Sequence, residues 1–269
     1  MEVQNITSLL DPTQWEASTK AQLKAAFKTA APYPHVVIDN FLEERFANEL
    51  YAHFPTTEEL SKQYSGLNEK KAEGANFEDF HPTFSTLRKL MMSTELAKWV
   101  GDITGIEGVF VTDDNLGTGL HEGSDGSFLD IHIDFNIHVE KNVHRRLNLL
   151  IYMNKDWQPE YGGDLEMWDA HMTQCEKKVA PLFNRCVIFE TSEISYHGYS
   201  KITVPPHLTR KSIYTYFYTE IREDAVAYHD TVFKAKPTDS LAKKVSTSVK
   251  EKLKNFAKAQ LRRVGITKK

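Results

Sequence analysis

The chain has 269 residues, of which 41% are hydrophobic and 26% charged, with a formal net charge of −4. No apolar stretch approaches the ~20 residues that span a bilayer, and the polar, acidic N-terminus gives no reason to expect a signal peptide. Only Cys175 and Cys186 are cysteines, which excludes a disulfide framework and a thiolate zinc site and favours a reducing, cytoplasmic setting.

Helical periodicity dominates the first hundred residues. Residues 13–30 place Leu23, Ala26 and Phe27 on one face, which predicts a helix, and two prolines then precede a short strand at 36–38. The stretch 42–54 predicts a second helix, and 83–105 predicts one or two more. Residues 70–80 are polar and indicate a loop.

From about residue 107 the pattern changes to short runs of Val, Ile, Tyr and Phe between turn residues. Seven strands are predicted without intervening helices, which indicates a sandwich or jelly roll. They lie at 108–113, 129–139, 146–153, 164–168, 186–190, 195–199 and 211–221.

The stretch "LDIHIDFNIHVE" (129–140) alternates apolar and polar residues. Strand geometry therefore puts His132 and Asp134 on one face, about 6–7 Å apart, together with Asn136 and His138. Two ligands of one small cation would lie this way, although an ordinary polar strand face would look the same. His138 lies too far along the strand to be a ligand, and we expect a structural or surface role for it and for His144.

Two later stretches add to this pattern. His197, in "SYHGYSKI", follows a strand and a turn, and it is either a further metal ligand or a buried histidine bonded to backbone. In "LTRKSIYTYFYTEI", Arg210, Ser212, Tyr214 and Tyr216 share a strand face. An arginine with a serine two residues on suits a carboxylate, although a surface arginine would give the same pattern. Two histidines and one carboxylate form the facial triad of mononuclear non-haem iron.

With these residues in view, the sequence resembles the Fe(II)- and 2-oxoglutarate-dependent oxygenase superfamily, and more narrowly its prolyl 4-hydroxylase-like branch. Four stretches carry the resemblance: "LDIHIDFN", "RRLNLLIYMNKDWQPEYGGDLEMWD", "ISYHGY" and "TRKSIYTYFYT". It covers about residues 34–222 and implies a mainly β double-stranded β-helix, a distorted and cupin-like jelly roll with flanking helices.

The resemblance further implies that His132, Asp134 and His197 hold Fe(II). Arg210 would bind the distal carboxylate of 2-oxoglutarate, with Ser212 and Tyr152 as hydrogen-bond partners. The implied reaction is hydroxylation of an unactivated C–H bond by O2, with release of succinate and CO2 and with ascorbate as a reductant. We expect Asn136 and Trp168 to be substrate contacts, and 60–80 and 115–128 to be lids.

The substrate class stays open between a small molecule, such as an amino acid or natural-product intermediate, and a peptidyl proline or ribosomal protein. A non-catalytic, cupin-like metal protein is the alternative from a different class, but it has no need of Arg210 and Ser212. A zinc hydrolase fits poorly because no His-Glu-x-x-His motif is present.

The predicted domain organisation is an N-terminal helical segment (1–33), a dioxygenase domain (34–224, with its jelly-roll core at about 107–222) and a basic helical extension (225–269). Residues 241–269 hold ten Lys/Arg and one Glu. Leu241, Val245, Val249 and Leu253 follow one another at a spacing of four, with Phe256 nearby, which predicts an amphipathic helix. We expect this helix to pack on its own acidic domain; a nucleic-acid or lipid partner is the alternative, and an oligomer is compatible with the sequence.

Overall fold

The computed structural model describes residues 6–223 and 225–249. Four α-helices occupy the N-terminal part: α1 (Ala17–Thr29), α2 (Glu44–Ala52), α3 (Pro82–Met91) and α4 (Thr94–Thr104). Short 3₁₀ helices accompany them at Ile6–Leu9, Pro12–Trp15, Phe77–Asp79 and Pro159–Tyr161. The helices form where predicted, and the Ser93 side chain caps α4 by accepting a hydrogen bond from the Leu96 amide.

The strands make one extended antiparallel sheet that rolls over on itself. Its order is β1-β10-β7-β12-β4-β3-β5-β11-β8-β9, and β13, β2 and β6 pair at the sides of this path. The strands are β1 (His35–Ile38), β2 (Lys62–Ser65), β3 (Glu69–Gly74), β4 (Thr118–Gly123), β5 (Phe128–Ile133), β6 (Ile137–His138), β7 (Val143–Tyr152), β8 (Leu165–Trp168), β9 (Cys175–Val179), β10 (Arg185–Glu190), β11 (His197–Tyr199), β12 (Arg210–Glu220) and β13 (Val232–Phe233). The prediction of a mainly β jelly roll with flanking helices is confirmed.

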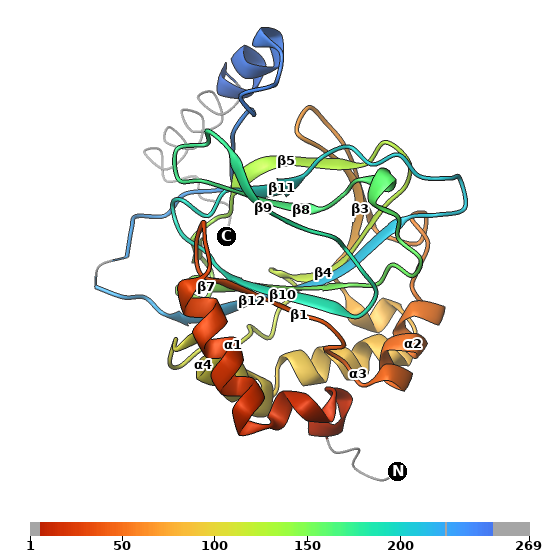
Figure 1. The fold of residues 1–269 in the computed structure, drawn as a ribbon, viewed down its shortest axis with the longest axis vertical. Coiled ribbons are helices and arrows are strands. Elements are labelled where there is room, and N and C mark those ends of the chain that lie inside the picture. Colours follow the sequence, from red (N-terminus) through yellow and green to blue (C-terminus); the bar gives the residue numbers. More distant parts are fainter. Residues whose placement is uncertain (1–5, 224, 250–269) are drawn as a thin grey trace.

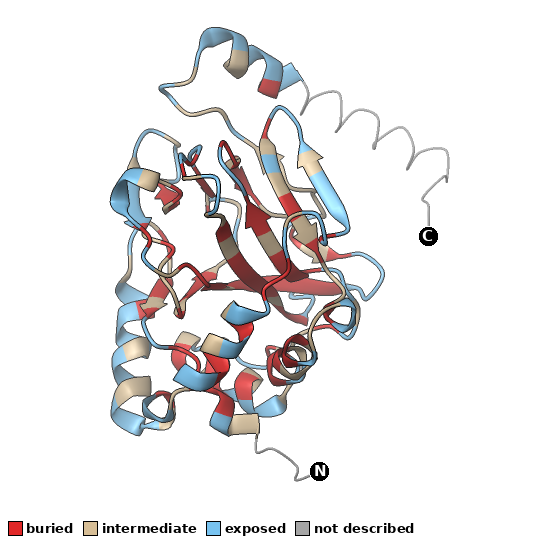
Figure 2. Cartoon of the chain, turned by 90° about the vertical axis from the view of Figure 1, so that its right-hand side faces the viewer, coloured by how far each residue is buried: buried red, intermediate tan, exposed pale blue. Residues whose placement is uncertain are grey.

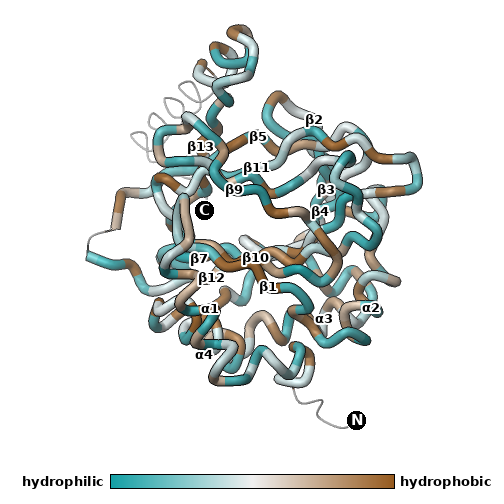
Figure 3. The backbone as a smooth tube through the Cα atoms, in the orientation of Figure 1, coloured by the Kyte–Doolittle hydropathy of each residue, from teal (hydrophilic) through white to brown (hydrophobic). Residues whose placement is uncertain are grey.

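The main core lies between the helices and one layer of this roll. Figure 1 shows α1, α3 and α4 under the layer of β1, β10, β7 and β12, while β5, β11, β8 and β9 form the opposite layer. Alternation along β7 explains the arrangement, because Leu147, Leu149 and Ile151 join the helix-facing core while Asn148 and Tyr152 point the other way into the roll. Buried residues concentrate in these strands and on the helix faces turned to them (Figure 2), and hydrophobic stretches recur along β10 and β1 (Figure 3).

Several predicted elements were wrong in detail. The loop predicted at 70–80 was wrong, because this stretch contains most of β3, which forms a hairpin with β2. The segment 115–128 contains β4, which pairs with both β3 and β12, and the lid role of both segments stays a prediction. Strand β9 was missed, and residues 108–113 contribute a single bridge, Phe110 with Tyr218, in place of a strand. The missed strands β3 and β9 are rich in charged residues, which sequence patterns associate with loops.

The first part of the C-terminal extension, up to residue 236, lies along the domain. Residues 226–236, here called the C-terminal strap, include β13, which pairs with β5. Beyond the strap, residues 241–249 are helical, but Leu241 and Val245 are 80% and 61% exposed. Lys243 faces the domain and forms an ion pair with Asp130 at 2.8 Å, while the described apolar residues Leu241 and Val245 point outward. Packing of the whole helix on its own domain stays a prediction. Leu253, Phe256 and the rest of the predicted helix lie outside the described residues.

No helix within 6–223 or 225–249 combines the length and apolar character that crossing a membrane would require. Both cysteines are free thiols.

Candidate metal centre

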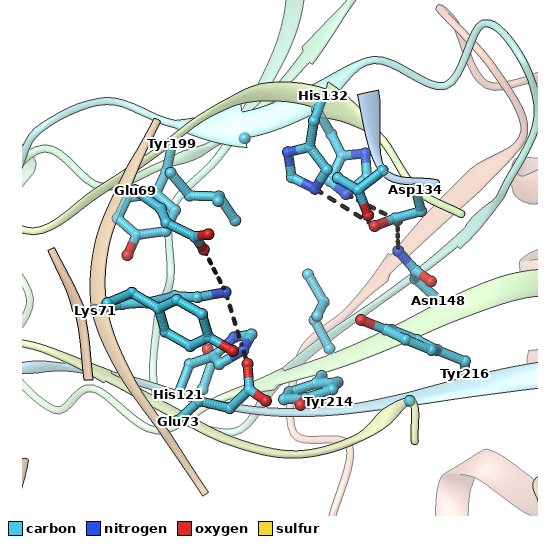
Figure 4. A pocket seen from close by; sticks show the side chains of 18 of the residues that line it. Glu69, Lys71, Glu73, His121, His132, Asp134, Asn148, Tyr199, Tyr214 and Tyr216 are labelled. Atoms are coloured by element: carbon cyan, nitrogen blue, oxygen red, sulfur yellow. Dashed lines mark hydrogen bonds and ion pairs between the residues drawn. The ribbon is translucent and has the colours of Figure 1, made fainter. Parts of the chain in front are cut away.

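Strand pairing brings His132, Asp134 and His197 together. His132 on β5 stands directly opposite His197 on the antiparallel strand β11, and Asp134 follows on the same side, just past the end of β5. One ligand atom from each of the three lies within 4.8 Å of the others. In Figure 4 His132 and Asp134 lie at one side of a pocket inside the roll, and His197 lines the same pocket.

Both imidazoles are oriented by the backbone. His132 Nδ1 donates to the Asp130 carbonyl and His197 Nδ1 to the Ser195 carbonyl, each at 2.9 Å. Because a carbonyl can only accept, each Nδ1 must carry the proton, and each Nε2 keeps its lone pair for a cation. These Nε2 atoms lie 3.4 Å and 3.3 Å from the Asp134 carboxylate oxygens. Burial, together with the neighbouring His132, lowers the pKa of His197 to about 4, which favours the neutral, metal-binding form.

Two donors fix the Asp134 carboxylate. Asn148 Nδ2 and an Arg145 guanidinium nitrogen each lie 2.8 Å from Oδ2. Burial would raise the pKa of Asp134, but Arg145 and the two histidines outweigh it and hold that pKa well below its usual range. Arg145 itself is fully buried against the rings of Phe135 and Tyr216. The carboxylate is therefore ionised and held in one orientation before any cation arrives.

This donor set fits ferrous iron. Two neutral imidazole nitrogens and one carboxylate oxygen converge from one side, and the opposite side faces the pocket, as a facial triad with open positions requires. The hydrogen bonds behind each donor are of the kind that orients metal ligands.

Arg210 points into the same pocket from β12. It is 5% exposed, its Nε donates to the Gly163 carbonyl at 2.8 Å, and its guanidinium carbon lies 4.0 Å from the centre of the Tyr199 ring. The "Gly-Gly" of the sequence motif explains this position. Gly163 has φ +75°, and a Cβ there would lie 3.1 Å from Arg210 Cδ.

Ser212 and Tyr152 lie beside Arg210. They are cross-strand partners on β12 and β7, and both line the pocket. The buried Tyr152 hydroxyl has no hydrogen-bond partner of good geometry among the described residues, although Arg210 lies 5.0 Å from its ring centre. An arginine, a serine hydroxyl and a spare phenol thus provide donors for one carboxylate group.

The pocket has a volume of about 440 Å³. Its wall includes the triad, Arg210, the β2–β3 hairpin and two residues of the C-terminal strap, Thr231 and Phe233. The Phe233 ring lies 5.4 Å from the His132 ring, because β13 pairs with β5 at this position. Sequence patterns gave no reason to bring the strap to the metal side of the pocket.

Asn136 and Trp168 are not among the residues that line the pocket, and their role as substrate contacts stays a prediction. The Asn136 amide donates to the carbonyls of Val226 and Ala227, so it anchors the strap. Trp168 donates to Glu166 at 3.0 Å. The chain breaks its strand after Ile133, and the buried His138 pairs with Asp114 at 2.8 Å, away from the triad. His144 is buried on β7 and is not among the pocket-lining residues.

Sequence patterns also missed the charged wall opposite the triad. Glu69, Lys71 and Glu73 of β3 and His121 of β4 all line the pocket. The available signal was their spacing, since charges at alternate positions of a strand share one face. Because the stretch contains so many charged residues, its sequence pattern indicated a loop rather than a buried strand.

Comparison with known proteins agrees with this geometry. The model of the 2OG-Fe(II) oxygenase superfamily matches residues 118–218, which include the triad and Arg210. Two curated relatives, both prolyl 3-hydroxylase OGFOD1, are 25% identical over 209 residues (mouse, Mus musculus) and 24% identical over 201 residues (Xenopus laevis). The matches cover 76% and 70% of this chain but only 36% and 35% of those proteins, so the chain spans about a third of their length.

Solved structures share the fold. A Pseudomonas putida prolyl-4-hydroxylase superimposes with a TM-score of 0.53 at 18% identity, covering 74% of this chain and 99% of that one. A Trichoplax adhaerens prolyl hydroxylase, solved with a hypoxia-inducible factor peptide fragment, gives 0.52 at 17% identity, covering 77% and 93%.

Proposed function

The chain belongs to the 2OG-Fe(II) oxygenase superfamily, and we propose that it hydroxylates an unactivated C–H bond in the manner of a prolyl hydroxylase. The cofactors are Fe(II) and 2-oxoglutarate, with O2 as co-substrate. We assign the dioxygenase domain to residues 34–224.

His132, Asp134 and His197 would hold the iron. Arg210, with Ser212 and Tyr152, would bind the distal carboxylate of 2-oxoglutarate. When bound, iron and 2-oxoglutarate would together allow O2 to hydroxylate the substrate, with decarboxylation of 2-oxoglutarate to succinate and CO2.

The single observation that carries this proposal is that a facial triad and a carboxylate-binding arginine line one pocket. A metal-binding protein without oxygenase activity would need the triad but not a buried Arg210 aimed at the same cavity. The cupin-like alternative is therefore not favoured. Nor do the ligands carry the His-Glu-x-x-His arrangement of a zinc hydrolase.

The other pocket residues prepare the site for this chemistry. Asn148 and Arg145 keep the Asp134 carboxylate ionised and in place, so that little reorganisation is needed when a cation binds. Phe233 covers the His132 ring from the strap side, and Leu150 and Leu165 add apolar wall. Together they limit water beside the metal ligands, which protects a reactive centre from side reactions.

Two substrate classes are compatible with this site. The curated relatives are prolyl 3-hydroxylases by name, and the Trichoplax enzyme was solved with a peptide fragment, so peptidyl proline is one candidate. A small molecule of amino-acid size is the other.

The test is succinate formation from 2-oxoglutarate by the purified, iron-loaded chain, with substrate candidates added in turn. Asp134→Ala should abolish succinate formation, because it removes the only carboxylate of the triad. Undiminished turnover by this variant would contradict the assignment. Lys234→Met, an exposed change on the strap, is the matched control and should retain wild-type turnover.

A further inference from the structure

Strand β3 lines the pocket with charges. Glu69, Lys71 and Glu73 face inward at alternate positions, while Lys70 between them is exposed and Ala72 and Gly74 are buried on the outer side. Inward positions of a small barrel are normally filled by packed side chains, and removing charges from water is costly. Three successive inward charges therefore call for a reason beyond structural stability.

Contacts within the protein explain the inward charge of Glu73, but not those of Glu69 and Lys71. Its carboxylate oxygens lie 3.1 Å from Lys62 Nζ and 3.2 Å from His121 Nε2, and the His121 ring stacks on Tyr214 at 4.3 Å. These contacts satisfy Glu73 within the protein. Glu73 is therefore held in place by its neighbours and is not expected to need a ligand.

Lys71 is poorly satisfied by comparison. Its side chain is 9% exposed, yet its Nζ lies 3.4 Å from Glu69 and 3.3 Å from His121 Nε2, both longer than a charge-assisted hydrogen bond. His121 Nε2 is also the atom that faces Glu73, and one ring nitrogen cannot donate to a carboxylate and accept from an ammonium together. When His121 donates to Glu73, two contacts of Lys71 Nζ remain among the described residues. These are the 3.4 Å ion pair with Glu69 and the Tyr64 ring, whose centre lies 5.4 Å away.

We propose that Glu69 and Lys71 bind the ammonium and carboxylate groups of a free α-amino acid or a close zwitterionic analogue. Glu69 is 25% exposed, and Lys71 is its ion-pair partner among the described residues. A zwitterion placed between them replaces one loose contact by two charge-assisted hydrogen bonds. Figure 4 shows this pair across the pocket from the triad, so the carbon skeleton of the ligand would extend towards the metal side.

The inference rests on the proposed function and narrows it. An internal proline of a peptide has neither free group, so it cannot use both Glu69 and Lys71. Arg210 lies elsewhere in the pocket with Tyr152 and Ser212, which leaves Lys71 to the substrate rather than to 2-oxoglutarate.

The experiment is calorimetric binding to the full chain loaded with Mn(II), a redox-inert substitute for Fe(II), and 2-oxoglutarate. The probes are L-proline and the other free proteinogenic amino acids, then the N-acetyl and amide derivatives of the best binder, and a proline-containing peptide. We expect at least one free amino acid to bind. Blocking either end, or introducing Lys71→Met or Glu69→Gln, should weaken binding about tenfold or more.

Lys70→Met is the matched control, because it removes the neighbouring, outward-facing charge, and it should change affinity less than about twofold. The 2-oxoglutarate affinity should be unchanged in every variant, which also shows that each one folds. Binding of the peptide but of no free amino acid, or equal binding of blocked derivatives, would overturn the inference while leaving the proposed function intact. Loss of 2-oxoglutarate binding in a Lys71→Met protein that still binds Mn(II) would overturn it too, because Lys71 would then bind 2-oxoglutarate rather than the substrate. Failure of the wild type to bind 2-oxoglutarate would overturn the proposed function itself.

Discussion

His132 and His197 are direct cross-strand neighbours, with ring centres 4.4 Å apart on the antiparallel strands β5 and β11. The pairing needs close backbone approach beside them, and Gly198 provides it. A Cβ on Gly198 would lie 2.6 Å from the Leu129 carbonyl oxygen and 2.8 Å from that of Asp130, which orients His132. The metal centre thus depends on a residue with no side chain.

Gly198→Ala should therefore damage both fold and site. Pushing β11 away from β5 should cost roughly 1–3 kcal/mol in the free energy of unfolding, as overpacking does in other cores, and it should weaken metal binding. Urea denaturation and Co(II) titration measure the two effects. Gly66→Ala is the control, since its nearest neighbour would be 3.9 Å from the new Cβ. Wild-type metal affinity in Gly198→Ala would contradict this role.

Gly163→Ala should weaken the binding of 2-oxoglutarate but not the binding of the metal. The new methyl group would press on Arg210 and on Ile202, 2.7 Å away, and displace the guanidinium. We expect 2-oxoglutarate affinity to fall about tenfold or more while metal affinity is retained, because a displaced charged donor loses its hydrogen bonds to the ligand. Gly162→Ala is a matched control: it shares the positive φ, but its Cβ would meet only the Lys201 carbonyl at 3.5 Å. Equal effects of the two changes would show that backbone strain, rather than Arg210, is responsible.

Stability should depend on pH through His121. This residue faces Lys71 and Glu73 of β3 and stacks on Tyr214 of β12. Burial and then Lys71 lower its pKa from 6.5 to about 4. Between these values the unfolded chain binds a proton that the folded chain does not, so stability falls as pH falls from 6.5 to 4.

His121→Gln should remove this contribution, which amounts to at most about 1.4 kcal/mol per pH unit. The measurement is the free energy of unfolding of both proteins at several pH values from 7 to 4. Other histidines titrate in both and cancel in the difference. Parallel curves for wild type and variant would contradict a lowered His121 pKa.

The C-terminal strap should detach when its ion pair is removed. Lys236 Nζ lies 2.8 Å from Glu166 Oε2, and both side chains are mostly buried, so Lys236→Met leaves a poorly hydrated carboxylate. We expect faster amide exchange within 226–247 and faster chymotryptic cleavage there, at aromatic residues such as Tyr228 and Phe233 that neither variant removes. Lys234→Met, on an exposed side chain, should leave both rates unchanged. Unaltered exchange in Lys236→Met would show that β13 pairing and the Asn136 contacts hold the strap without this ion pair.

Much of this architecture could be predicted from the sequence, because period-two alternation is a strong signal. It put His132 and Asp134 on one face, and Arg210, Ser212, Tyr214 and Tyr216 on another, and all six line the pocket. Asn136 does not line the pocket for a physical reason: β5 ends at Ile133, so alternation no longer holds three residues later.

The charged strand β3 and the strap could not be predicted in the same way. The inward face of β3 is polar because it borders a cavity, which inverts the usual link between hydrophobicity and burial. The strap is brought to the pocket by backbone pairing of just two residues, Val232 and Phe233, with β5, and by scattered side-chain contacts such as those of Asn136 and Lys236. Such a short pairing leaves no periodic signal.

The most direct test of the central claim is an anaerobic titration of the metal-free chain with Fe(II) and then 2-oxoglutarate, followed by visible absorption. We predict that a weak charge-transfer band appears only when both are present. Arg210→Ala should bind iron but fail to give the band at the same 2-oxoglutarate concentration. Iron binding without any band in the wild type would reduce the site to a metal centre without its cosubstrate, and no iron binding would contradict the account altogether.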